Sequence, residues 1–125
     1  MQYDPDIAPN PEEWLALDED ERILLVKDFH RRARVRLPNA NAHAAMHVAV
    51  ENQIALGDSL PVRRELERLR REGLDRHDAV HAIASVLADH MFTLVNKPQA
   101  ISGDPNEAYY RALSRLTAHK WRSSS

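Results

Sequence analysis

Apolar side chains recur at intervals of three and four residues along most of the chain, the spacing that lines one face of an α-helix. In the segment "ALDEDERILLVKDFHRRA" one side of such a helix carries Ile23, Val26, Phe29, His30 and Ala33. Asp18 precedes Glu21 by three residues, the arrangement of a capping box. The pattern therefore predicts a helix over residues 18–33, with a short helical turn around residues 12–17 before it.

Breaks in the periodic pattern separate further helices. Gly57 and Gly73 should end helices over residues 40–56 and 61–72, and Asp75 should cap a helix that runs to about residue 95. A last helix is expected over residues 105–118. Residues 1–10 are expected to be an extended N-terminal segment, residues 96–104 a loop and residues 122–125 a frayed tail. With no β pattern, the sequence predicts an all-α fold, a small helical bundle of four to five helices in a single domain spanning residues 1–125.

The composition of the chain limits the ligands and partners that we expect for this all-α protein. The chain has 17 basic and 19 acidic residues and no cysteine, so any metal site must use nitrogen and oxygen ligands. The run "RRELERLRRE" is typical of a solvated helix face, and we do not expect nucleic-acid binding. The N-terminus is acidic and interrupted by proline, unlike a signal peptide, and no apolar run approaches membrane-spanning length. We therefore expect a cytoplasmic protein with no membrane partner, and leave a protein partner or homodimer open.

Two histidine pairs stand out against this background. The segment "NAHAAMHVAVEN" places His43, His47 and Glu51 four residues apart, and "DRHDAVHAIASV" repeats the spacing with His77 and His81. Residues four apart lie on the same side of a helix. On a helical wheel His43 and His47 face the core with Glu51 at the edge of that arc, while His77 and His81 lie on the flank of their apolar face.

Chain lengths predict that the two pairs meet. The helix over residues 61–72 should return antiparallel, which would make the helices that carry the pairs parallel neighbours with their first turns side by side. His30, near the end of the first long helix, should reach the same end of the bundle. We therefore expect five histidines and Glu51 to converge.

Such a group is typical of a metal site, because two imidazoles one turn apart can bind a single ion. The predicted ligands are His30, His43, His47, Glu51, His77 and His81. Zinc is the favoured ion, with iron and manganese as alternatives. The other interpretation is that the histidines are neutral core residues, each bonded to a backbone carbonyl or to water.

The segments "HAAMHVAVENQIALGD" and "RLRREGLDRHDAVHAIASVLADHMF" resemble a bacterial protein family known only as domain of unknown function 1841. The resemblance covers roughly His30 to the final helix. It implies an all-helical bacterial protein in which the two histidine pairs and Glu51 match the histidine-rich pattern of the family. It implies no activity.

Three functions remain open from the sequence. The first is a metal-binding helical protein whose ion has a structural or sensory role. The second is a metal-dependent hydrolase, in which three histidines hold zinc, the open position holds water and Glu51 is the catalytic base. The third is a metal-free protein interaction module whose histidines respond to pH. Whether the protein is an enzyme is therefore undecided at this point.

Overall fold

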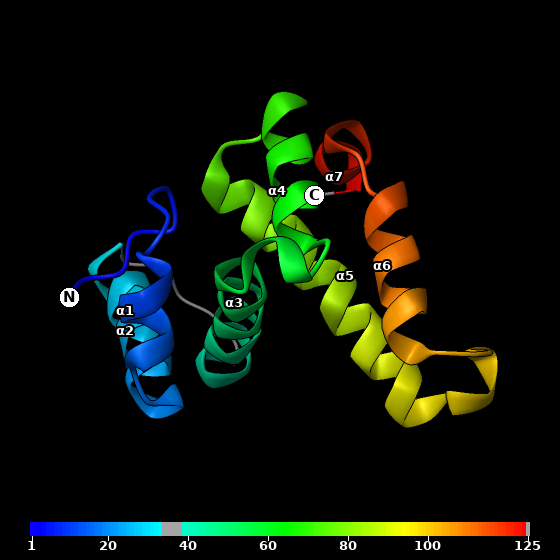
Figure 1. Ribbon diagram of the computed structural model, residues 1–125, viewed down its shortest axis with the longest axis horizontal. Helices are drawn as coiled ribbons and strands as arrows, with labels where there is room; N and C mark the ends of the chain where they lie inside the picture. Colours follow the sequence, from blue (N-terminus) through cyan, green and yellow to red (C-terminus); the bar gives the residue numbers. More distant parts are fainter. Residues whose placement is uncertain (34–38, 125) are drawn as a thin grey trace.

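The computed structural model of the protein describes residues 1–33 and 39–124. These residues form seven α-helices and two 3-10 turns, and no strand occurs among them (Figure 1). The helices are α1 (Pro11–Ala16), α2 (Glu19–Arg32), α3 (Ala40–Ala55), α4 (Val62–Arg71), α5 (Arg76–Asn96), α6 (Pro105–Arg115) and α7 (Ala118–Ser124), and the turns are η1 (Gly57–Ser59) and η2 (Pro98–Ala100). The all-α prediction is confirmed, but the helices outnumber the expected four to five.

Side-chain caps define where the helices that carry the histidine pairs begin. Asn39 accepts a hydrogen bond from the amide of Ala42 at the start of α3, and Asp75 accepts one from Asp78 at the start of α5. Asp18 occupies the cap position of α2 but its side chain makes no capping hydrogen bond, so the predicted capping box does not form. Gly57, with φ of 66°, follows the last turn of α3 in the left-handed conformation that glycine favours.

The C-terminal helix is broken where the sequence predicted continuity. α6 ends at Arg115, Leu116 is extended, and α7 begins at Ala118 and includes part of the tail that was expected to be frayed. The backbone amide of Ala118 donates to the carboxylate of Glu72 at the end of α4, which gives the start of α7 a partner outside its own helix. Ser125 lies outside the described residues.

α3 lies between two groups of helices (Figure 1). On one side it packs against α1 and α2, and on the other against α4 and α5, with α6 beyond α5. Each side has its own apolar core. The smaller one consists of Tyr3, Trp14, Val26, Ala44 and Val48, and the larger one includes buried residues of α3, α4, α5 and α6. The histidine pairs lie on α3 and α5, the two helices in contact at the centre.

The relative direction of α3 and α5 differs from the expectation. Glu51, late in α3, pairs with Arg76 at the start of α5, whereas His43, early in α3, lies against His81. Partners along the two helices therefore run in opposite order, and their first turns are not side by side. α5 starts beside the last turns of α3 because α4 does not carry the chain back to the beginning of α3. The histidines still meet, because both pairs face the contact between α3 and α5.

α5 is also long and apolar enough, by length and composition, to cross a membrane, with a mean hydropathy of 1.2 over the relevant window. The expectation that no apolar run approaches this length was therefore wrong for this helix. The first half of α5 packs inside the protein, including Val80, Ile83 and Leu87. A core helix of a soluble protein passes the same test of length and composition, so a single such helix does not assign a membrane.

Asn52 joins the N-terminal helices to α3. Its Oδ1 accepts a hydrogen bond of 2.9 Å from the indole of Trp14 on α1 and one of 3.0 Å from the guanidinium of Arg22 on α2. Trp14 is fully buried. One amide oxygen therefore satisfies two donors from two helices, and it holds the layer that includes His30 against α3.

Replacing Asn52 by alanine should lower the free energy of unfolding by about 1–3 kcal/mol, because the buried indole N–H loses its acceptor. Urea unfolding measures the change. The control is Asn106→Ala, an exposed position on α6, where we expect a change within about 0.5 kcal/mol. Equal destabilisation by the two variants would contradict the role assigned to Asn52.

Candidate metal centre

Three helices bring the predicted histidines together. His30 comes from the last turn of α2, His43 and His47 from α3, and His77 and His81 from the first turns of α5. Ring nitrogens of His30, His47, His77 and His81, here called the quartet, all lie within 4.8 Å of one another. The ring centroid of His43 lies 4.8 Å from that of His30 and 5.1 Å from that of His81. The quartet and His43 together are called the histidine group.

Most ring nitrogens of the histidine group have no hydrogen-bond partner. The Nε2 atoms of His43, His47, His77 and His81 are buried without a protein partner, and so are both nitrogens of His30. Leaving a buried polar atom unsatisfied costs about 1–3 kcal/mol, so proteins rarely gather several in one place. A cation placed among these atoms would accept the lone pairs of several rings at once.

The spacing of the quartet suits one ion after small side-chain adjustments. A zinc ion binds imidazole nitrogen at about 2.0–2.1 Å, which in a tetrahedral site separates the nitrogens by about 3.4 Å. The quartet atoms span up to 4.8 Å, so rotations that move each ring by less than about 1 Å would close the site.

Tyr3 determines which nitrogen of His47 carries the proton. The Tyr3 hydroxyl donates its only hydrogen to Oε2 of Glu51, and it lies 3.1 Å from Nδ1 of His47. Because that hydrogen is already used, the hydroxyl can only accept from His47, which places a proton on Nδ1. The Nε2 atom of His47 is then left with a free lone pair, and this buried atom has no protein partner. Metal-binding histidines are commonly oriented by such a partner on the second nitrogen.

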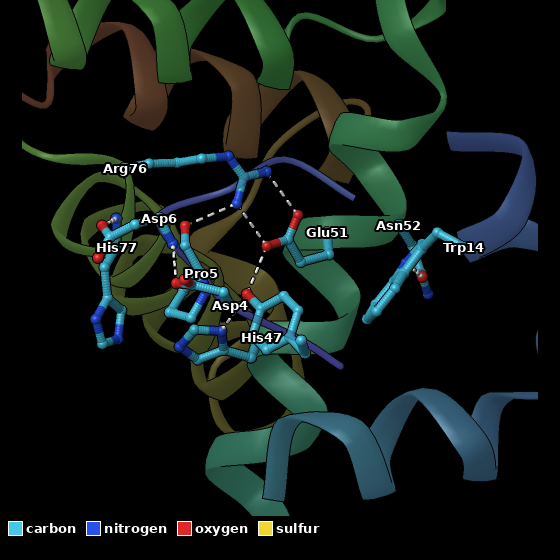
Figure 2. A network of polar contacts seen from close by, with 10 residues as sticks. Asp4, Pro5, Asp6, Trp14, His47, Glu51, Asn52, Arg76 and His77 are labelled. Carbon is cyan, nitrogen blue, oxygen red and sulfur yellow. Dashed lines mark hydrogen bonds and ion pairs between the residues drawn. The ribbon is translucent and has the colours of Figure 1, made fainter. Parts of the chain in front are cut away.

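Glu51 is engaged away from the histidine nitrogens. Its two carboxylate oxygens each accept a hydrogen bond of 2.8 Å from the guanidinium of Arg76, and both side chains are 1% exposed (Figure 2). Oε2 also accepts the hydrogen bond from Tyr3. This position differs from the expected roles of Glu51 as a metal ligand and catalytic base, because both oxygens already have partners. Glu51 instead orients Tyr3, and through Tyr3 it orients His47.

The N-terminal segment forms part of the site, although it was expected to be merely extended. Arg76 also donates to the carbonyl oxygen of Pro5 at 2.9 Å, and the amide of His77 donates to Asp6 at 3.2 Å (Figure 2). Tyr3 and Pro5 are buried. Sequence reasoning missed Tyr3, for which no local signal exists. Arg76 had one: a basic residue in the first turn of a helix opposes the helix dipole, so a buried one needs an acidic partner.

Burial and mutual repulsion lower the pKa of four of these histidines, His30, His43, His47 and His81. Burial is the main cause that lowers the pKa of His30 and of His81 to about 4 and that of His47 to about 2, and neighbouring imidazoles lower each pKa further. The pKa of His43 is lowered for the same reasons. Burial and the charge of Glu51 raise the pKa of Tyr3 above its usual value, so Tyr3 remains a hydrogen-bond donor. Neutral imidazoles are the form that binds a metal.

A pocket of about 380 Å³ opens beside the histidine group. His43 and His81 form part of its wall, and the rest of the lining is Ala42, Met46, Ala84, Ser85, Ala88 and Trp121. Apart from the two histidines, no residue that lines the pocket is acidic or basic. The histidine group is therefore accessible from one side through a small and mostly apolar pocket.

Comparison with known proteins identifies the family. No significant match was found to a curated protein or to a solved structure. The model of one family, described as a domain of unknown function (DUF1841), matches residues 6–115, a range that includes all five members of the histidine group, Glu51 and Arg76. Since the match covers well over half of the chain, the protein belongs to the DUF1841 family, as its histidine pattern indicated.

Proposed function

We propose that this protein binds one divalent transition-metal ion through the quartet of His30, His47, His77 and His81. The observation that carries the proposal is the convergence of four buried ring nitrogens within 4.8 Å, with the Nε2 atoms left without protein partners. His47 adds a tautomer held by Tyr3 that directs its Nε2 atom toward the other rings. His43 lies next to the quartet, where it is available as a further ligand or as a hydrogen-bond donor.

The metal-free alternatives are less well supported. A set of neutral core histidines needs a partner for each buried nitrogen. Within the described part of the chain, Tyr3 is a partner for His47 alone, and five Nε2 atoms have none. A pH-responsive interaction module would face the same deficit at neutral pH, when the imidazoles are uncharged.

The ligand type favours zinc. With Glu51 held by Arg76, the quartet supplies only imidazole nitrogens, which suit zinc and also iron. Manganese prefers carboxylate and water oxygens, so it fits this set less well.

A binding role also fits better than the hydrolase in which Glu51 is the base. That mechanism needs a free carboxylate next to a metal-bound water. Both Glu51 oxygens accept hydrogen bonds from Arg76, and no acidic residue lines the adjoining pocket. The proposed ion therefore has a structural, sensory or ligand-binding role.

The first prediction concerns stoichiometry. Protein purified without added metal or chelator should contain close to one equivalent of zinc or iron by elemental analysis, and His47→Ala should lose tight binding because it removes the best-oriented ligand. The matched control is His119→Ala, since His119 is exposed on α7. Equal loss or equal retention of metal in the two variants would contradict the assignment.

The second prediction concerns Tyr3. Replacing Tyr3 by phenylalanine should preserve the fold and the number of bound ions but weaken zinc affinity about 10–100-fold, the usual effect of removing the partner that orients a ligand histidine. Competition with a chromogenic chelator measures the affinity. Tyr110→Phe is the control, because the Tyr110 ring is half-buried on α6, away from the quartet. An unchanged affinity in Tyr3→Phe would show that the hydroxyl does not orient His47.

The third prediction is that the metal-free protein loses stability as the pH falls below about 6.5. In the unfolded chain each histidine takes up a proton near that value, whereas in the folded protein His30 and His81 do so only near 4 and His47 near 2. Between these values the unfolded state binds more protons, so acid favours unfolding and the full stability is present above the unfolded pKa. Each histidine that stays neutral contributes a slope of at most about 1.4 kcal/mol per pH unit.

Urea unfolding at several pH values in the presence of a chelator measures this slope. His81→Ala should reduce the slope, because a histidine whose pKa is lowered in the folded protein is removed. His119→Ala should leave the slope unchanged. A stability that does not vary between about pH 6.5 and 4.5 would contradict the lowered pKa values of His30, His47 and His81.

A further inference from the structure

The proposed metal site lacks a negative charge. The quartet consists of imidazoles, which carry no negative charge, and Glu51 is the only acidic residue buried among the residues that the structure describes. Arg76 forms a two-point ion pair with Glu51, so the charge of that carboxylate is already balanced. Asp6 and Asp75 lie near the start of α5 but are exposed. A divalent ion in the quartet would therefore keep most of its double positive charge in a partly buried place, which is unfavourable without an anion.

The pocket beside the quartet is the place from which an anion can approach. His81 belongs both to the quartet and to the pocket wall, and His43 lines the pocket with a buried Nε2 atom that has no protein partner. Its volume of about 380 Å³ is at the small end of the range for small-molecule sites. Met46, Ala84 and Ala88 make most of the remaining wall apolar, and Ser85 also lines the pocket. The pocket thus offers a polar end at the two histidines and an apolar surface beyond them.

We infer that this pocket binds a small organic anion, a monocarboxylate with a short alkyl chain, with its carboxylate toward the metal and His43 and its chain along the apolar wall. The inference rests on the proposed function, because the ion supplies the positive charge that attracts the carboxylate. A cation of the same shape is excluded by the charge of the ion. A large or highly charged anion is disfavoured, since no arginine or lysine lines the pocket.

The test uses full-length protein loaded with cobalt(II), whose visible absorption responds to a change in its ligands. Formate and butyrate are titrated into the loaded protein, with butylammonium as the charge control. Butyrate should bind more tightly than formate, by about fourfold for each methylene group that enters the pocket. Butylammonium should leave the spectrum unchanged.

A variant that narrows the pocket tests its location. Ala88→Phe places a large ring in the pocket wall without altering any histidine, so cobalt uptake should remain at one equivalent while butyrate affinity falls at least tenfold. The matched control is Ala16→Phe, which makes the same change at an exposed position of α1 and should bind butyrate normally.

The outcomes separate this inference from the proposed function. Failure to take up cobalt would overturn the metal site itself. Cobalt uptake without a spectral response to either carboxylate would overturn the anion site alone. Equal affinities for formate and butyrate, or normal butyrate binding by Ala88→Phe, would show that the pocket does not hold the alkyl chain.

Discussion

The buried ion pair between Arg76 and Glu51 is the interaction on which the arrangement of the site depends. It joins the start of α5 to the last turns of α3, and Arg76 also binds the carbonyl of Pro5 in the N-terminal segment. Removing two charges from water is costly, so such a pair is tolerated only where further hydrogen bonds complete it. Tyr3 and Pro5 supply these bonds. Because the buried ion pair needs these hydrogen bonds, Tyr3 and Pro5, which are distant from it in the sequence, lie at the edge of the histidine group.

The same pair separates two kinds of buried polar group. On one side of the Tyr3 hydroxyl, Glu51 and Arg76 satisfy each other in a fully bonded network. On the other side, the ring nitrogens of the histidine group are largely without protein partners. Tyr3 links the two sides, because it donates to the carboxylate and accepts from His47. A substitution that disturbs the ion pair should thus alter the histidine group without touching a ring.

Sequence periodicity predicted the elements but not their assembly. The spacing of His43, His47, His77 and His81 placed each pair on one helix face, and the caps at Asn39 and Asp75 form where helices were expected to begin. Whether α3 and α5 run in the same direction depends on how α4 packs, which local patterns do not encode. The position of Tyr3 and the contacts of Glu51 were missed for a similar reason. Their roles arise from contacts across more than 40 residues, between Tyr3 and His47 and between Tyr3 and Glu51.

The proposed metal site differs in its charge balance from common structural zinc sites. Structural zinc sites commonly include thiolates or carboxylates, which offset the charge of the ion. This chain has no cysteine, and its single buried carboxylate among the described residues is committed to Arg76. A divalent ion bound by four imidazoles would consequently retain positive charge beside the pocket that His43 and His81 line. The ion pair that orients His47 thus also engages the one buried carboxylate that could have balanced the charge of the proposed ion, which is the reason for proposing an anion from solution.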